Sequence, residues 1–144
     1  MTPKESKEYL QQYKNAVDRS RAALEHLEEL QSMATRTTPN YASEGGGSHQ
    51  SGDEKLNDAV NKIIEAKNRV SDELEMLEAT EREIISTINS VKNKTLSTLL
   101  YKRYINYKTF EQISVELKYC WRQTLRLHGL ALQAVGEILD KRCH

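Results

Sequence analysis

The fold is decided by residues 53–93, which read D-E-K-L-N-D-A-V-N-K-I-I-E-A-K-N-R-V-S-D-E-L-E-M-L-E-A-T-E-R-E-I-I-S-T-I-N-S-V-K-N. Apolar residues recur every seven positions along this stretch, on two neighbouring seams. The first seam contains Leu56, Ile63, Val70, Leu77, Ile84 and Val91, and the second contains Val60, Leu74 and Ile88, interrupted by Lys67 and Glu81. A repeat kept for about five heptads is typical of a coiled coil. Asp53 is suited to be the N-cap of this helix.

An earlier stretch, from Lys4 to about Ala34, predicts another long amphipathic helix. Its apolar stripe contains Leu10, Tyr13, Val17, Leu24 and Leu27, widened by Ala16, Ala23 and Leu30. Between the two helices, residues 35–52 read T-R-T-T-P-N-Y-A-S-E-G-G-G-S-H-Q-S-G, and this composition predicts a flexible loop. Residues 1–93 are therefore expected to form a long antiparallel helical hairpin, a coiled-coil arm.

The two expected helices differ in length. At 1.5 Å per residue, a first helix of about 31 residues leaves the second, of about 40, overhanging by roughly 13 Å. The apolar side chains of Ile84, Ile88 and Val91 then need a different partner. Two partners are open: the C-terminal part of the same chain, or a second copy of the chain in a homodimer.

Charge is distributed unevenly along a chain whose net charge is zero. Residues 1–93 contain 12 Lys and Arg against 17 Asp and Glu, a balance of -5, whereas residues 94–144 contain nine against four, a balance of +5. This asymmetry suggests that the C-terminal third meets a polyanion.

Several functional classes are disfavoured by composition. No apolar run approaches the ~18 to 20 residues of a membrane span, and the first residues lack the apolar region of a signal peptide. Cys120 and Cys143 are too few for a disulfide framework, and His128, His144 and Cys143 lack partners at zinc spacing. No nucleophile–base or paired-carboxylate pattern stands out. We therefore expect a cytoplasmic protein with no cofactor, no metal and no enzymatic activity.

After residue 93 the pattern changes to three shorter helices. The first is expected over residues 95–105, and the second over residues 110–117 with Thr109 as its N-cap. The turn K-Y-C, residues 118–120, leads to a third helix over residues 121–139. Two helices joined by so tight a turn, behind a supporting helix, indicate a helix-turn-helix domain over residues 94–144.

The residues of this domain resemble region four of sigma-70-type RNA polymerase factors. They are closer still to the phage late-transcription regulators of the ArpU/RinA type. The shared patterns are L-L-x-x-R-Y-I, [KT]-x-x-E-x-I, Y-[ST] and R-L-H-x-x-A-L, over residues 99–105, 109–113, 119–120 and 126–132. The same regulators have an N-terminal pattern that resembles Y-L-Q-Q-Y, which here is Tyr9–Tyr13. A weaker resemblance therefore extends over nearly the whole chain. Cys120 departs from the usual Ser or Thr, which predicts a weaker cap on the last helix.

The resemblance implies a phage or prophage regulator that activates late genes at promoter DNA. It would act on double-stranded DNA in the bacterial cytoplasm, associated with the nucleoid, with RNA polymerase as a further expected partner. A different class remains open, in which the domain is an adaptor that binds RNA polymerase without reading DNA.

Within the domain, two groups of residues are candidates for DNA contact. Base edges are within reach of the first two turns of the last helix, which carry Trp121, Arg122, Gln123, Leu125 and Arg126. Phosphates are the expected partners of Lys102, Arg103, Lys108 and Lys118, with Thr109 beside them. The alternatives are a solvated helix face for the basic residues, an ion pair of Arg103 with Glu111, and a packing role of Trp121 over the turn.

Overall fold

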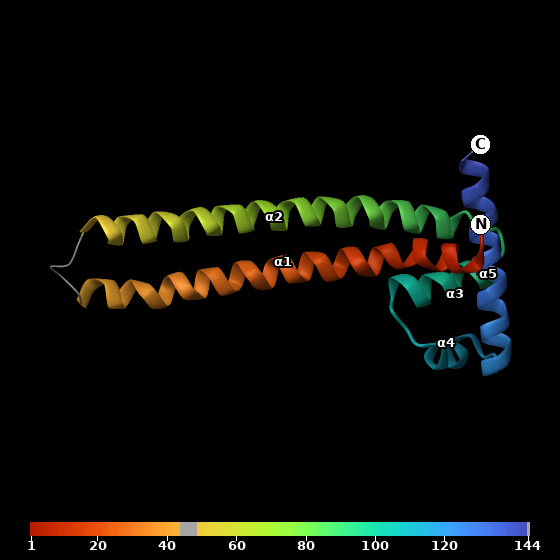
Figure 1. Cartoon of the computed structure of the whole chain (residues 1–144). Helices are drawn as coiled ribbons and strands as arrows, with labels where there is room; N and C mark the ends of the chain where they lie inside the picture. The colour runs from red at the N-terminus through yellow and green to blue at the C-terminus, as the bar shows by residue number, and fades with distance from the viewer. Residues whose placement is uncertain (44–48, 144) are drawn as a thin grey trace. The chain divides into compact units, whose positions relative to one another are not determined.

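The computed structural model describes residues 1–43 and 49–143, with side chains for residues 1–36 and 54–143. Every regular element in these ranges is a helix, so the predicted all-α class is confirmed (Figure 1). In chain order the elements are α1 (Pro3–Ser43), α2 (His49–Asn89), α3 (Lys94–Leu100), the π-helix η1 (Tyr101–Ile105), α4 (Phe110–Leu117) and α5 (Trp121–Arg142). Among the described residues, no helix is long and apolar enough to cross a membrane.

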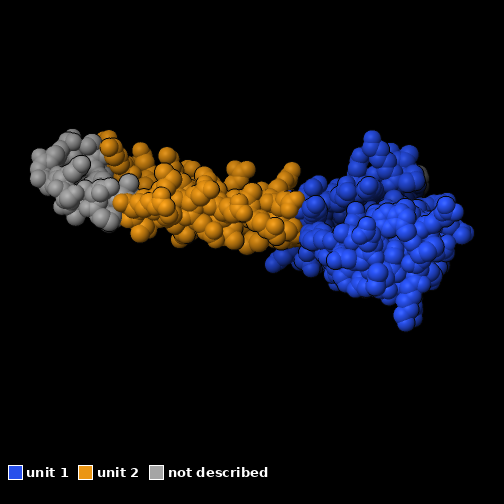
Figure 2. Space-filling view, turned by 90° about the horizontal axis from the view of Figure 1, so that it is seen from below, with its two compact units in different colours: residues 1–16, 78–144 blue, residues 17–77 orange. Residues whose placement is uncertain are grey.

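The chain divides into two compact units (Figure 2). Unit 1 contains residues 1–16 and 78–144, and unit 2 contains residues 17–77. In each unit a stretch of α1 lies beside a stretch of α2 that runs in the opposite direction (Figure 1).

Helix α1 begins with a reciprocal capping arrangement. The Glu5 backbone N–H donates to Thr2 Oγ1 at 3.2 Å, and the Thr2 backbone N–H donates to Glu5 Oε2 at 3.4 Å. This capping box satisfies two donors that have no partner within the helix. Pro3 follows as the first helical residue, where its missing N–H costs nothing.

The predicted loop over residues 35–52 is wrong in its extent. Helix α1 continues to Ser43 and α2 already begins at His49, while residues 44–48 lie outside the described residues. Asp53 is therefore inside α2 and is not its N-cap. The Thr, Ser, Asn and Gln residues of this stretch each cost only a few tenths of a kcal/mol in a helix. Pro39 lies inside α1 at a cost of about 3 kcal/mol, and nothing in the described residues explains it.

The predicted overhang is also wrong, because α1 and α2 each contain 41 residues. Ile84, Ile88 and Val91 are nevertheless buried, and their partner is the C-terminal part of the same chain. The core of unit 1 brings together Leu10, Ile84, Ile88, Val91, Leu96, Leu100, Tyr104, Ala131, Leu132, Val135 and Leu139. A second copy of the chain is not needed to cover these residues.

Along most of α2 the second seam lies one position earlier than predicted, although Ile88 is fully buried as expected. The inward positions are Ala59, Ala66, Glu73, Thr80 and Thr87, of which Ala66 is buried and Thr87 is fully buried. Val60 and Leu74 are instead 45% and 47% exposed, and Leu24 of α1 is 46% exposed beside the buried Ala23. A seven-residue repeat is equally consistent with either adjacent seam, and small side chains on the inner one let two helices approach closely.

Candidate nucleic-acid interface

Helix α4 begins at a second capping box. Thr109 Oγ1 accepts from the Gln112 backbone N–H at 3.2 Å, and Gln112 Oε1 accepts from the Thr109 backbone N–H at 3.0 Å. The predicted N-cap role of Thr109 is thus confirmed. The Gln three residues after the Thr is the sequence signal for this arrangement.

The turn between α4 and α5 has the backbone of a tight helix connection. Lys118 adopts φ 61° and ψ 37°, and its N–H donates to the carbonyls of Ser114 and Val115. The Tyr119 N–H donates to Ser114 O at 3.1 Å, which closes the end of α4. Cys120 then precedes α5 in an extended conformation without a side-chain capping bond, as its weak acceptor character predicts.

Buried hydroxyl groups fix the angle between α4 and α5. Ser114 Oγ lies 2.8 Å from Thr124 Oγ1, and Thr124 donates in turn to Cys120 O at 3.0 Å. Ile113 is fully buried beside them. Because these polar groups satisfy one another inside the core, the first turn of α5 is held rigidly against α4.

A buried pair of aromatic rings supports the same helices from η1. Tyr104 Oη and His128 Nε2 are 2.7 Å apart, and the Phe110 ring meets the His128 ring edge-on at 4.8 Å between centroids. Burial lowers the pKa of His128 to about 4, assisted by the positive charges of Arg103 and Lys7. Burial also raises the pKa of Tyr104 to about 12. At neutral pH the phenol and the imidazole are therefore both uncharged, and the imidazole tautomer decides which of them donates the hydrogen bond.

The outer face of the first two turns of α5 is basic and open to solvent. Arg122, Leu125 and Arg126 are exposed, whereas Gln123 is half-buried. Trp121 is 49% exposed and packs edge-on against Phe110, with ring centroids 6.3 Å apart. The indole of Trp121 therefore packs on the first residue of α4, and about half of the residue remains exposed to solvent.

Arg103 has a structural position that the sequence analysis missed. Its guanidinium lies 4.3 Å above the centroid of the Phe110 ring, and its Nη1 donates to Lys108 O at 3.0 Å. The alternative ion pair with Glu111 is not among the ion pairs of the described residues. A cation over an aromatic face and a carbonyl acceptor together fix the connection that leads into α4.

The remaining lysines divide into two kinds. Lys118 is exposed in the turn before α5. Lys102 and Lys108 both reach Glu116, in the last turn of α4. The sequence analysis did not identify Glu116 as their partner, because a spacing of 8 and 14 residues across a bend leaves no periodic signal.

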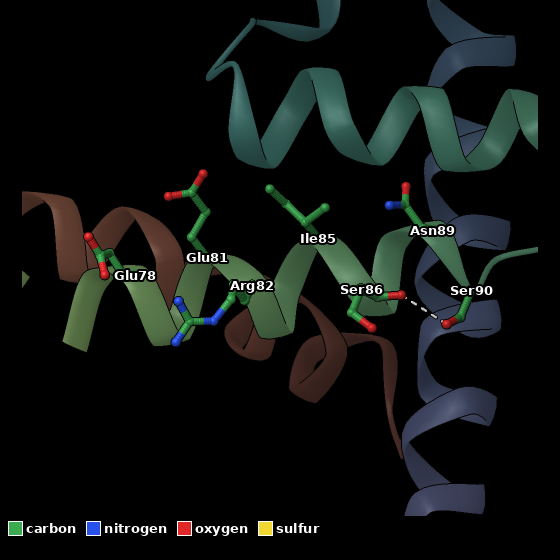
Figure 3. A pocket seen from close by; sticks show the side chains of 7 residues that line it. All are labelled: Glu78, Glu81, Arg82, Ile85, Ser86, Asn89 and Ser90. Atoms are coloured by element: carbon green, nitrogen blue, oxygen red, sulfur yellow. Dashed lines mark hydrogen bonds between the residues drawn. The ribbon is translucent and has the colours of Figure 1, made fainter. Parts of the chain in front are cut away.

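Unit 1 also contains a shallow groove of about 670 Å³ along α2 (Figure 3). It is lined by Glu78, Glu81, Arg82, Ile85, Ser86, Asn89 and Ser90. Glu81 and Ile85 point to the same side of the helix, and the Ser90 hydroxyl donates to the carbonyl of Ser86 at 2.8 Å. These side chains do not form a nucleophile–base arrangement, and the described residues contain no group of three His, Cys, Asp or Glu that could hold a metal ion.

The first two turns of α5, which carry Arg122 and Arg126, are therefore the best-defined candidate site in unit 1. A scan against protein-family models, a search of curated proteins and a search of solved structures found no match for this chain.

Proposed function

We propose that the protein is a DNA-binding transcription regulator in which α5 is the recognition helix of a helix-turn-helix. The observation that carries this proposal is the solvent-facing set Arg122, Leu125 and Arg126 on the first two turns of α5. In a helix-turn-helix these turns reach base edges in the major groove, and Arg can contact guanine through two hydrogen bonds.

Two further features support DNA as the ligand. The three-residue turn and the buried Ser114–Thr124 contact hold α5 rigidly, and a rigid support is needed to place side chains against bases. The excess of five positive charges in residues 94–144 favours a polyanion. Together with the resemblance of residues 99–132 to ArpU/RinA-type regulators, these features favour a phage or prophage activator at promoter DNA.

A competition assay with matched single-charge variants tests the proposal. Arg122→Ala should weaken binding to a selected site by roughly 1 to 3 kcal/mol and leave random duplex little changed. Lys118→Ala should weaken all duplexes alike and reduce the salt slope by about one. Lys141→Ala is the control, since it removes one positive charge from the last turn of α5, about 28 Å along the helix from Arg122.

The outcomes are distinct. If Arg122→Ala lowers specific and random binding in the same proportion, the base-reading role falls, and Arg126 or Gln123 replaces it. If the Arg122 and Lys118 variants both behave like Lys141→Ala, the DNA-binding face is not at this end of α5.

The proposal includes a homodimer, since helix-turn-helix proteins commonly place two recognition helices about 34 Å apart on two half-sites. Unit 2 offers exposed apolar residues for a contact, among them Leu24, Val60 and Leu74. Light scattering at micromolar concentration should give twice the 16.6 kDa of one chain, and Leu74→Gln should lower that mass. A mass of one chain at all concentrations would remove the dimer and leave the DNA proposal standing.

An adaptor that binds RNA polymerase without reading DNA is the second candidate. It is favoured by Val115, which is 78% exposed on α4, and by the 40% exposed Tyr119 in the following turn. A salt titration separates the two functions. A DNA binder loses affinity linearly with the logarithm of salt concentration, whereas an adaptor of this kind has no affinity for duplex at low salt.

A further inference from the structure

Two lysines from different segments of unit 1 meet at one carboxylate oxygen. Lys102 lies in η1, Lys108 in the connection to α4, and Glu116 in the last turn of α4. The Lys102 Nζ is 3.6 Å from Glu116 Oε1, and the Lys108 Nζ donates a hydrogen bond to the same oxygen. The three side chains are 23%, 32% and 35% exposed, respectively. They are therefore accessible to a ligand but partly shielded from salt.

The backbone fixes the positions from which the two lysine side chains extend. The Lys108 N–H donates to Lys102 O at 3.0 Å, and the Arg103 guanidinium holds Lys108 O from the other side. The hydrogen bond from Lys108 and the charge of Lys102 lower the pKa of Glu116, so its carboxylate is ionised at neutral pH. Two ammonium groups around one anionic oxygen can also bind an oxygen of a backbone phosphate.

We infer that Lys102 and Lys108 form a phosphate-binding site for DNA, which Glu116 occupies in the free protein. This inference rests on the proposed function. When a duplex binds, a phosphate oxygen replaces the carboxylate oxygen between the two ammonium groups. Glu116 then remains close to a like charge, so it lowers affinity for every duplex regardless of sequence.

The expected size of the effect follows from Coulomb's law. A carboxylate about 5 Å from a phosphate, in a partly solvated site, weakens binding by about fivefold to fifteenfold. A carboxylate that leaves its lysines also takes up a cation from solution. Removing its charge should therefore make the dependence of log affinity on log salt steeper by about one.

The experiment compares Glu116→Gln with Glu111→Gln, using a fluorescent random duplex at four salt concentrations. Glu111 is the matched control because it is an exposed glutamate on the same helix, and both substitutions change the net charge equally. We expect Glu116→Gln to bind about fivefold to fifteenfold more tightly than the unchanged protein and with the steeper slope. Glu111→Gln should differ from the unchanged protein by less than about threefold.

A chain that lacks both lysines tests whether they cause the tighter binding of Glu116→Gln. In a Lys102→Ala, Lys108→Ala chain, adding Glu116→Gln should change affinity no more than Glu111→Gln does. Circular dichroism confirms that each variant is folded, and the double-lysine background gives an independent answer if Glu116→Gln alone loosens α4.

Two results would overturn the inference, and they differ in what they leave standing. If the unchanged protein binds duplex and Glu116→Gln matches Glu111→Gln, the phosphate site falls and the proposed function stays. If the unchanged protein and Glu116→Gln both lack duplex affinity at low salt, the proposed function falls and the phosphate site falls with it.

Discussion

The burial of the His128 ring predicts that unit 1 loses stability on mild acidification. The pKa of His128 is lowered to about 4 in the folded chain, against 6.5 for an unperturbed histidine. Between these two values the unfolded chain binds a proton that the folded chain excludes, so the free energy of unfolding falls as the pH falls. From pH 7.5 to pH 5 the loss is about 2 kcal/mol for a fully buried ring. It is about 1 to 1.5 kcal/mol when the remaining solvent contact is allowed for.

The single tryptophan makes this loss measurable near its source. Trp121 packs on Phe110, and Phe110 packs on the His128 ring, so tryptophan fluorescence reports unfolding of this region. Urea titrations at pH 7.5 and pH 5 should show the midpoint moving to lower urea at pH 5. Glu116, whose lowered pKa lies below 4.5, affects stability only at more acidic pH and does not enter this window.

Substitution of the histidine supplies the control. His128→Gln can still accept the Tyr104 hydrogen bond but does not titrate, so its free energy of unfolding should change by less than about 0.5 kcal/mol over the same pH range. His26→Gln, at an exposed position in unit 2, should keep the full pH dependence. An unchanged pH dependence in His128→Gln would refute the reasoning, because the proton uptake would then belong to another group.

Further substitutions test the backbone and packing of unit 1. Lys118→Gly should raise stability by about 1 kcal/mol, because glycine adopts the left-handed conformation without strain, while lowering duplex affinity as Lys118→Ala does; a loss of stability on urea unfolding would contradict the turn geometry. Gly129→Ala should stabilise α5 by roughly 0.5 to 1 kcal/mol, because no atom lies within 4 Å of the added methyl group. Gly136→Ala should gain less than Gly129→Ala or lose stability, since its methyl group would meet Ser6 Oγ at 3.1 Å; equal melting temperatures would contradict this close approach. Ser6→Ala should stabilise by about 1 kcal/mol, because its buried hydroxyl has no hydrogen-bond partner among the described residues, and thermal unfolding measures the gain.

The range of α4 and the start of α5 were predictable because each of these boundaries has a local chemical cause, whereas the π-helix η1 and the end of α5 at Arg142 were not predicted. Thr109 is a strong N-cap, and the expected and observed range of α4 is residues 110–117. The start of α5 at Trp121 was also expected from the short turn. Such signals act over three or four residues, and no distant contact is needed to interpret them.

Features that depend on distant contacts were not predictable in the same way. The second seam of α2 was assigned to Val60, Leu74 and Ile88, because large apolar residues were expected to be buried; Ile88 is buried, but Ala66 is buried in place of Val60 and Leu74. The C-terminal end of α1 was placed too early and the start of α2 too late, because a composition rich in turn-forming residues was interpreted as a loop. Glu116 was not predicted as the partner of Lys102 and Lys108, nor His128 as the partner of Tyr104, because in each pair the two residues lie in different segments.

The charge count illustrates how much of the candidate site depends on these distant contacts. Residues 94–144 carry an excess of five positive charges, which by itself suggests many phosphate contacts. In the folded chain Arg103 is held by Phe110 and a carbonyl group, and Lys102 and Lys108 share Glu116. The exposed cations nearest the turn are then Arg122, Arg126 and Lys118. Under the proposed function, Arg122 and Arg126 on the first two turns of α5 and Lys118 in the preceding turn would contact DNA directly, whereas Lys102 and Lys108 would do so only after Glu116 leaves them.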